Sequence, residues 1–353
     1  MNRRALLQLA SNMGLGAAAS TLSARGMDKA PVPARYRTPY KFGKLVLGPS
    51  GVDNEFDSRS VDCPFLFRHA GQFYMTYVGW DGVGYQTGLA SSTDLLNWKR
   101  QACILKRDPS SEVTRYNVAM NWIVRENGLR QPGELLQIDG RFLGIYHAYP
   151  NSGYEAGPAV IGLCWSHDLR HWTLDAPCLR PGDGAAWERG GLYKPCLVKV
   201  GGLFHLFYNA KTDEAKGWRE QTGVATSKDL KQWTRYENNP IIPNGAAGCW
   251  DERFASDPCV LEDNGTWVFF YYGLDAKGKA RDLVAAGDLF HPRKIDEILI
   301  DVGQPGSVDE TYAHKPGIIW HDGALYHFYC AVSGKWPNQV RGISVARSKP
   351  FEA

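Results

Sequence analysis

Hydrophobic and polar residues alternate over short segments of this chain, and one fifteen-residue version of the pattern occurs five times. Each copy has an apolar run, a turn with glycine at the seventh position, and a second apolar run with tyrosine at the thirteenth. The clearest copy is CVLEDNGTWVFFYYG (259–273), in which Asp263-Asn264-Gly265 separates the two runs. An Asn-Gly turn between alternating runs is the strongest short-range signal for a β-hairpin. The sequence therefore predicts five hairpins, at 65–79, 134–148, 196–210, 259–273 and 317–331.

A third apolar segment follows every hairpin, so that each repeat holds three or four short strands. These segments lie at 87–93, 161–167, 222–228, 283–288 and 342–348. The first three run into Asp-Leu-x-x-Trp, which ends at Trp98, Trp172 and Trp233. Units of this size, repeating at about 60 residues, are typical of propeller blades, whose flat faces are covered only when neighbours stack around a ring. The prediction is an all-β fold with a single five-bladed β-propeller over residues 34–353.

The repeat has two irregularities. A longer insertion, at 104–132, separates the first unit from the second. The fifth unit has no Asp-Leu-x-x-Trp segment, so its outer strand is missing from the C-terminal end of the chain. Residues 40–47 are apolar enough to supply that strand, and we expect them to close the ring by joining the two ends of the chain.

The first 33 residues read as an export signal and linker. Met1-Asn2-Arg3-Arg4 is basic, and it precedes a weakly apolar run followed by small residues. That run is too short and too polar to span a bilayer stably. Paired arginines before such a run indicate the twin-arginine route, which carries folded cargo. We expect a periplasmic or extracellular protein with no membrane insertion once the signal is removed.

Composition narrows the class of partner. A hydrophobic content of 44% in 353 residues suffices for a large core, and a net charge of +3 is too small to indicate a nucleic-acid partner. Twelve tryptophans and seventeen tyrosines provide stacking surfaces for flat ligands. Of the eight cysteines, Cys63, Cys196 and Cys259 adjoin the proline at the start of a strand, where a thiol is a small buried apolar group. We expect few or no disulfides.

Charged residues precede the first strand of each unit. In a propeller the innermost strands start at one end of the central channel, so these residues are expected to converge there. Taken singly, Asp before Pro is ordinary turn chemistry. As a set, carboxylates interleaved with cations and imidazole perturb one another's pKa, which is typical of a functional site. The set comprises Asp57, Arg59, Asp62, Asn117, Asn121, Glu188, Arg189, Lys194, Glu252, Arg253, Asp257, Asp309, Glu310, His314 and Lys315.

Two carboxylates facing each other across a pocket are what glycosidic cleavage requires. Hairpins such as GQFYMTYVG (71–79) and tails such as ATSKDLKQW (225–233) resemble those of the five-bladed propeller glycoside hydrolases, a set that includes families 43, 117, 32 and 130. The resemblance covers nearly everything after residue 40. The resemblance to family 43 implies that Asp62 is the general base, although Lys194 stands where that family has an aspartate. The resemblance to family 117 implies that His314 has the acid role.

The sequence predicts a separate role for each group of site residues. Asp62 is the candidate base and Asp257 the second carboxylate, which orients the base or tunes its pKa. The proton donor is open among four residues: Glu188, Glu252, Glu310 and His314. The candidates for stacking on sugar are Trp80, Trp122, Tyr193, Trp250 and Trp336. The polar candidates for substrate binding are Arg59, Asn117, Asn121, Arg189, Lys194, Arg253 and Lys315.

The predicted function is hydrolysis of a plant or algal oligosaccharide or polysaccharide with inversion at the anomeric carbon. Two alternatives stay open. Cations beside carboxylates also suit phosphate in a phosphorylase similar to some members of family 130, although export disfavours a reaction that needs phosphate. The other alternative is a non-catalytic carbohydrate-binding propeller. No cofactor is required, and the resemblance leaves open a structural cation in the channel.

Overall fold

The computed structural model describes residues 31–352 except 214–216 and 336–337. Most of the predicted leader, and the candidate Trp336, therefore lie outside the described residues. Besides three short 3-10 helices (Ala34–Tyr36, Pro181–Asp183 and Ala186–Glu188), the described elements are all strands. None of the described helices is long and apolar enough to cross a membrane. The prediction of an all-β chain is confirmed.

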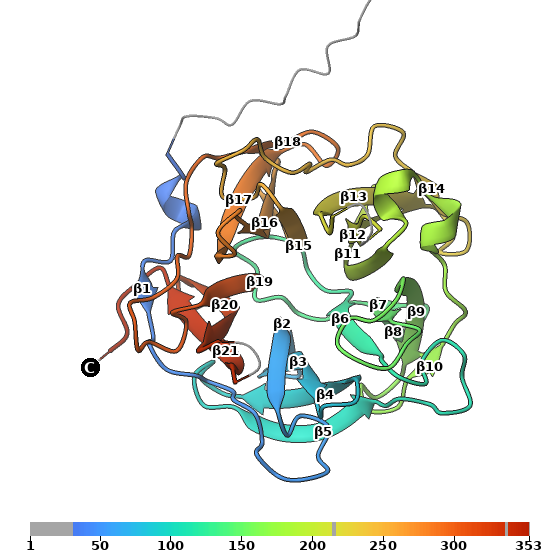
Figure 1. Cartoon of the computed structure of the whole chain (residues 1–353), viewed down its shortest axis with the longest axis horizontal. Coiled ribbons are helices and arrows are strands. Elements are labelled where there is room, and N and C mark those ends of the chain that lie inside the picture. The colour runs from blue at the N-terminus through green and yellow to red at the C-terminus, as the bar shows by residue number, and fades with distance from the viewer. Residues whose placement is uncertain (1–30, 214–216, 336–337, 353) are drawn as a thin grey trace, which may run out of the picture.

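The strands form successive antiparallel units, arranged around a common centre (Figure 1). The first contains β2 (Ser60–His69), β3 (Gln72–Trp80), β4 (Tyr85–Ser92) and β5 (Lys99–Leu105). The second contains β6 (Ala119–Ile123), β7 (Gln137–Ile138), β8 (Arg141–Ala148), β9 (Val160–Ser166) and β10 (Thr173–Leu174). The third contains β11 (Gly191–Val200), β12 (Leu203–Lys211), β13 (Glu220–Ser227) and β14 (Thr234–Arg235). The fourth contains β15 (Phe254–Asp263), β16 (Thr266–Leu274), β17 (Ala280–Gly287) and β18 (Pro292–Lys294). The last contains β19 (Tyr312–His321), β20 (Ala324–Ser333) and β21 (Val340–Arg347).

The repeat glycines lie in equivalent hairpin turns, as predicted. Every one is the second residue of a two-residue turn in which both residues have positive φ, between 47° and 85°. This is the turn whose twist matches that of the flanking strands, and glycine adopts its second position without steric cost. The five turns are Ala70-Gly71, Asp139-Gly140, Gly201-Gly202, Asn264-Gly265 and Asp322-Gly323.

The prediction that residues 40–47 join the two ends of the chain is also confirmed. Strand β1 (Tyr40–Lys41) pairs antiparallel with β21, with Tyr40 opposite Arg347, and Leu47 forms a further bridge with Ile343. The N-terminal segment thus lies where the other units have their own outermost strand.

The second unit departs from the predicted boundaries. Strand β6 lies inside the segment predicted as an insertion, yet it is the innermost strand of its unit and pairs with β8. The chain then leaves the sheet and returns as β7, which pairs with the other end of β8. Arg125 begins this excursion and donates to Leu66 O and Ile318 O, both at 2.7 Å, in two other units. These long-range bonds stabilise a departure that the local sequence pattern does not indicate.

The repeat tyrosine holds a buried carboxylate in four units. Its hydroxyl donates, at 2.8–3.1 Å, to a carboxylate twenty residues earlier in the chain. The same carboxylate pairs at 2.5–2.8 Å with a cation on the outermost strand, so the set ties that strand to the middle of its sheet. The four sets are Asp57–Tyr77–Arg100, Glu188–Tyr208–Arg235, Asp251–Tyr271–Lys294 and Asp309–Tyr329–Lys41.

The innermost strands β2, β6, β11, β15 and β19 face the centre, and each contacts the innermost strands on either side, with β19 against β2 (Figure 1). In four of them a β-bulge interrupts the pairing at the residue before proline. That residue has positive φ, from 49° to 68°, a conformation that costs about 1–3 kcal/mol for a non-glycine residue and clusters at functional sites. The four are Cys63, Lys194, Asp257 and Lys315.

Candidate active site

A cavity of about 400 Å³ lies between the third, fourth and fifth units and the loop between β8 and β9 of the second. Five of its fourteen lining residues are aromatic, and such rings suit the apolar faces of sugar rings. Cations and a histidine, Arg253, His314, Lys315 and Arg341, lie among them. The aromatic lining residues are Tyr154, Trp218, Phe254, Tyr272 and Tyr312. Its lining carboxylates are Glu155 and Glu220, and neither belongs to the set predicted from sequence.

Glu220 is fixed by four hydrogen-bond donors from three strands and a loop. Trp218 Nε1 donates to Oε1 at 2.8 Å. Ser256 Oγ, Asn209 Nδ2 and Tyr272 OH donate to Oε2, at 2.7, 3.0 and 3.2 Å. The residue is 1% exposed. Donors converging on one carboxyl group stabilise its charged form and hold it in one orientation.

Glu155 lies in the loop between β8 and β9 and has a left-handed backbone, with φ +49°. Two hydrogen bonds to backbone carbonyl groups hold the loop in place. Asn117 Nδ2 donates to Asn151 O at 2.9 Å, and Lys211 Nζ donates to Glu155 O at 3.3 Å. Asn117, a predicted site residue, therefore positions the loop and does not itself line the cavity. Glu155 is 9% exposed, against 1% for Glu220.

Lys211 lies opposite Glu220 in the register of β12 and β13. Its ammonium group is buried over the ring of Trp218, 4.3 Å from the ring centroid. A buried cation at this place favours negative charge in the cavity.

Asp62 is buried in an ion triad at the edge of the cavity. Lys315 Nζ lies 2.8 Å and Arg341 Nη1 2.9 Å from its Oδ2. Burial acts to raise the pKa of Asp62, but the charges of Lys315, Arg341 and Lys194 outweigh it and hold the pKa well below its ordinary value. A carboxylate bound this tightly by two cations is a weak proton acceptor.

Asp257 differs from Asp62 in both position and charge. In the repeat, Asp257 is equivalent to Cys63, because each precedes proline and has positive φ, whereas Asp62 is equivalent to Ser256. Burial raises the pKa of Asp257 to about 6, with Glu220 adding to the effect and Lys194 and Lys315 opposing it.

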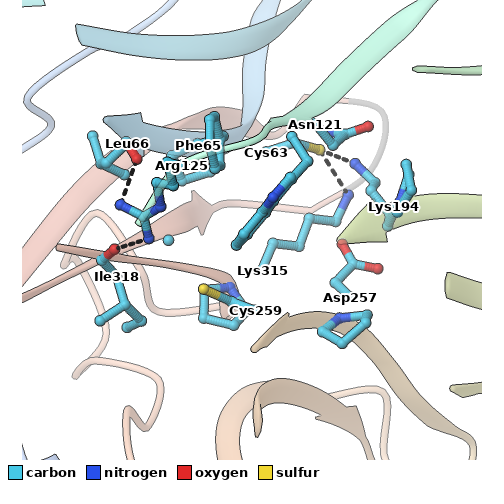
Figure 2. A pocket seen from close by; sticks show the side chains of 16 residues that line it. Cys63, Phe65, Leu66, Asn121, Arg125, Lys194, Asp257, Cys259, Lys315 and Ile318 are labelled. Carbon is cyan, nitrogen blue, oxygen red and sulfur yellow. Dashed lines mark hydrogen bonds between the residues drawn. The ribbon is translucent and has the colours of Figure 1, made fainter. Parts of the chain in front are cut away.

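A second, smaller cavity of about 40 Å³ lies in the channel (Figure 2). Every unit contributes to its lining, in which the polar side chains include Cys63, Asn121, Lys194, Asp257 and Lys315. Arg125 and Trp122 complete one side. Lys194 Nζ contacts Cys63 Sγ, and burial raises the pKa of that thiol to about 12. Lysine and arginine groups line this space, and the described residues contain no group of three His, Cys, Asp or Glu side chains placed to hold a metal ion.

The four candidate proton donors have different surroundings. Glu188 is the carboxylate of the set Glu188–Tyr208–Arg235, in which it pairs with Arg235. Glu252 and Glu310 close tight turns by accepting from the backbone N–H of Gly248 at 2.8 Å and Gly306 at 2.7 Å. Backbone hydrogen bonds, from Gly306 and then Gly334, lower the pKa of Glu310.

His314 lines the large cavity, and its Nδ1 lies 3.2 Å from Cys330 O. Burial, Lys315 and Arg341 hold its pKa well below the ordinary value. The imidazole is therefore neutral near pH 7.

The remaining predicted residues are scattered. Tyr193 is buried beside Tyr149, and Trp80 contacts Tyr154 at the cavity wall. Trp122 packs against Phe65 in the core, and Trp250 lies under the guanidinium of Arg281. Arg253 lines the cavity, whereas Arg59 and Arg189 are exposed and are not among its lining residues.

One signal for Glu220 is present in the sequence. The first residue of the third strand is Tyr85, Val160, Ala280 or Val340 in the other units, and only the third unit has a carboxylate there. A charged residue at a repeat position that is not charged in the other units indicates that the position serves a purpose other than packing. Glu155 lies in a loop outside the repeat and has no such signal.

Comparison with known proteins identifies the class. The model for the glycosyl hydrolases family 32 N-terminal domain matches residues 124–285, a span that includes Glu155, Glu220 and Asp257. A protein solved as a complex of BT0996 with RGII is 31% identical, with 89% of this chain and 93% of its own length covered and a TM-score of 0.77. The chain therefore belongs to the propeller-type glycoside hydrolases, as its sequence resemblance indicated.

Curated relatives include both hydrolytic and phosphorolytic enzymes. Raffinose invertase of Escherichia coli is 26% identical over 176 residues, which cover 48% of this chain and 35% of the invertase. The 1,2-beta-oligomannan phosphorylase of Thermoanaerobacter is 24% identical over 63% of this chain and 67% of its own length. The chain thus matches about a third of the invertase.

Proposed function

We propose that this protein is a glycoside hydrolase in which Glu155 and Glu220 are the two catalytic carboxyl groups. The observation that carries the proposal is that these are the carboxylates lining the aromatic cavity. Asp62 and Asp257, the pair expected from the repeat, are absent from that lining.

The surroundings of the two groups support the roles proposed for them. Glu220 is held as a carboxylate by four donors, so it is the group that attacks the anomeric carbon or activates water. Glu155, on a loop, protonates the leaving oxygen. Trp218, Phe254 and Tyr272 offer rings on which the sugar stacks. The chemistry uses no cofactor.

Hydrolysis fits these surroundings better than phosphorolysis. Two of the cations at the cavity, Lys315 and Arg341, are already engaged by Asp62. Arg189, offered from sequence as an anion ligand, is not among the cavity-lining residues. Water is therefore the proposed acceptor.

The substrate class proposed is a plant or algal oligosaccharide. The BT0996 protein was solved in complex with RGII, which makes that glycan the first to test. Inversion remains the prediction from sequence. Proton NMR of the anomer that forms first distinguishes inversion from retention.

The test is a hydrolysis screen against aryl glycosides and oligosaccharides including RGII fragments, with and without phosphate. Glu155→Gln and Glu220→Gln are expected to lower turnover by on the order of 10²–10⁴. Glu134→Gln, at a half-exposed ion pair with Arg68, is the matched control and keeps full activity. Loss of turnover in Glu252→Gln or Glu310→Gln instead would restore the assignment from sequence. Sugar binding without turnover would make the protein a lectin.

We also propose that the strand units form five blades of one propeller and that the protein is exported. The first rests on the five hairpin repeats, and an experimental structure tests it. The second rests on Arg3-Arg4 and the run that follows.

A further inference from the structure

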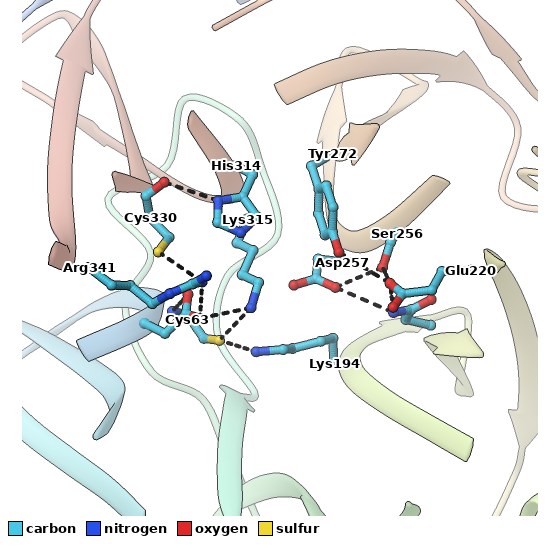
Figure 3. Close-up of polar contacts among 12 residues, drawn as sticks. Cys63, Lys194, Glu220, Ser256, Asp257, Tyr272, His314, Lys315, Cys330 and Arg341 are labelled. Atoms are coloured by element: carbon cyan, nitrogen blue, oxygen red, sulfur yellow. Dashed lines mark hydrogen bonds and ion pairs between the residues drawn. The ribbon is translucent and has the colours of Figure 1, made fainter. Parts of the chain in front are cut away.

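Glu220 and Asp257 are joined through one serine (Figure 3). Ser256 Oγ lies 2.7 Å from Glu220 Oε2 and 2.9 Å from Asp257 Oδ1. Asn209 Nδ2 also reaches both oxygens, at 3.0 and 3.5 Å. All four side chains are buried.

Counting hydrogens on these groups indicates that one of the two carboxyl groups carries a proton. A serine hydroxyl has one hydrogen and donates to only one oxygen at a time. The hydroxyl makes a full two-centre hydrogen bond at both contacts only if one carboxyl group is protonated and donates to Ser256 Oγ; otherwise the two carboxylates share a single bifurcated hydrogen. The amide of Asn209 has two hydrogens, so it satisfies one acceptor on each side without changing this count.

The proton belongs to Asp257. Glu220 receives three donors besides Ser256, and these stabilise a charged carboxylate. Asp257 Oδ2 has no hydrogen-bond partner in the part of the chain that the structure describes, and a buried unpartnered oxygen disfavours the charged form. Burial raises the pKa of Asp257 in the same direction.

We infer that Asp257 is a positioning residue that acts as a neutral carboxylic acid, donating to Ser256 so that Ser256 donates to Glu220. Loss of the Asp257 proton reverses the serine hydroxyl, removes a donor from Glu220 and places a second negative charge beside it. The inference rests on the proposed function for the role of Glu220. The protonation of Asp257 rests on the hydrogen bonds, the burial and the unpartnered Oδ2 described above, and not on that role.

Charged and titratable groups on several neighbouring strands interact electrostatically with Asp257. The ammonium groups of Lys194 and Lys315 favour ionisation, whereas the other groups favour the neutral acid or are themselves neutral. These groups include Cys63 on β2, Lys194 on β11, Glu220 on β13, Tyr272 on β16, Asp282 on β17 and Lys315 on β19.

The first experiment needs no substrate. In protein labelled with ¹³C at the aspartate carboxyl carbons, one resonance is expected to titrate near pH 6, to be absent in Asp257→Asn, and to shift in Ser256→Ala. Thr222→Val is the matched control, since Thr222 Oγ1 donates to Ala255 O at 2.9 Å between the same two strands without touching a carboxylate. An Asp257 resonance that titrates near the ordinary value of 3.8 overturns the inference, whatever the protein hydrolyses.

The second experiment reads out the role in turnover. It follows kcat/KM against pH with an aryl glycoside whose leaving group needs no protonation, so that Glu155 does not contribute a limb. The wild type is expected to lose activity above about pH 6. Asp257→Asn, whose amide donates to Ser256 as the acid does, keeps the acid-side rate within about threefold and loses this limb. Asp257→Ala lowers the rate about tenfold or more, the effect of a missing hydrogen bond of about 1.5 kcal/mol.

Each outcome decides one question. If Asp257→Asn is as inactive as Glu220→Gln, Asp257 acts as an ionised catalytic group and the inference is wrong. If Asp257→Asn keeps the wild-type limb, the inference is also wrong. If Glu220→Gln remains fully active while the Asp257 resonance titrates near pH 6, the proposed function fails and the protonation of Asp257 is retained.

Discussion

Closure of the ring by the N-terminal segment provides the sharpest test of the fold. Lys41 Nζ lies 2.6 Å from Asp309 Oδ2, with side-chain exposures of 29% and 4%. Lys41→Met removes the ammonium group and keeps the apolar stem. Asp309 then retains the hydroxyl donors of Tyr329 and Ser307, both at 2.9 Å, but loses its only ion pair among the described residues.

Breaking a buried pair costs about 3–5 kcal/mol. Partial exposure of Lys41 and the two remaining donors reduce this, so we expect Lys41→Met to lower the free energy of unfolding by about 2 kcal/mol. Urea-induced unfolding followed by tryptophan fluorescence measures the change. In the Asp309→Asn background the same substitution is expected to cost less than about 1 kcal/mol, which isolates the pair.

Lys44→Met is the matched control, because Lys44 is an exposed lysine on the same segment. Its effect is expected to stay within about 0.5 kcal/mol. If Lys41→Met is as stable as Lys44→Met, the segment does not hold the ring closed, and the prediction is refuted.

The remaining predictions concern catalysis, pH and export. Glu155→Gln should recover most of its loss when the leaving group is a dinitrophenolate, whereas Glu220→Gln should not, and turnover of both substrates measures the split. Because the pKa of Asp257 is raised from 3.8 to about 6, its contribution to the free energy of unfolding falls as pH rises through that window, by up to about 3 kcal/mol, and then levels off. Asp257→Asn removes this slope, and urea unfolding at a series of pH values tests it. Replacing Arg3 and Arg4 by Lys should leave precursor in the cytoplasm, and fractionation with immunoblotting checks the route.

Local signals in the sequence determined the fold class and the hairpins. Two-residue turns ending in glycine demand positive φ, and that demand is readable wherever Asn264-Gly265 or a similar pair separates apolar runs. The missing outer strand of the last unit was likewise predictable, because a repeat shows where one of its members is lacking. The excursion after β6 was not predictable, since Arg125 is stabilised by carbonyl groups more than fifty residues away in the chain.

The sequence analysis did not name the two carboxylates, Glu155 and Glu220, that line the large cavity. Sequence reasoning grouped Asp62 with Asp257, because both open a first strand. The bulge before proline places them one position apart in the repeat, and the two cations beside Asp62 come from β19 and β21.

The carboxylates that share the cavity were decided by tertiary structure. Glu220 opens a third strand and Glu155 lies in a loop, and stacking of the units brings both to one cavity with Trp218 and Tyr272. The hydrogen bonds of Ser256 then join Glu220 on one strand to Asp257 on another. A sequence specifies each side chain and its strand, but charge states depend on burial and on neighbours from other units, which only the folded ring supplies.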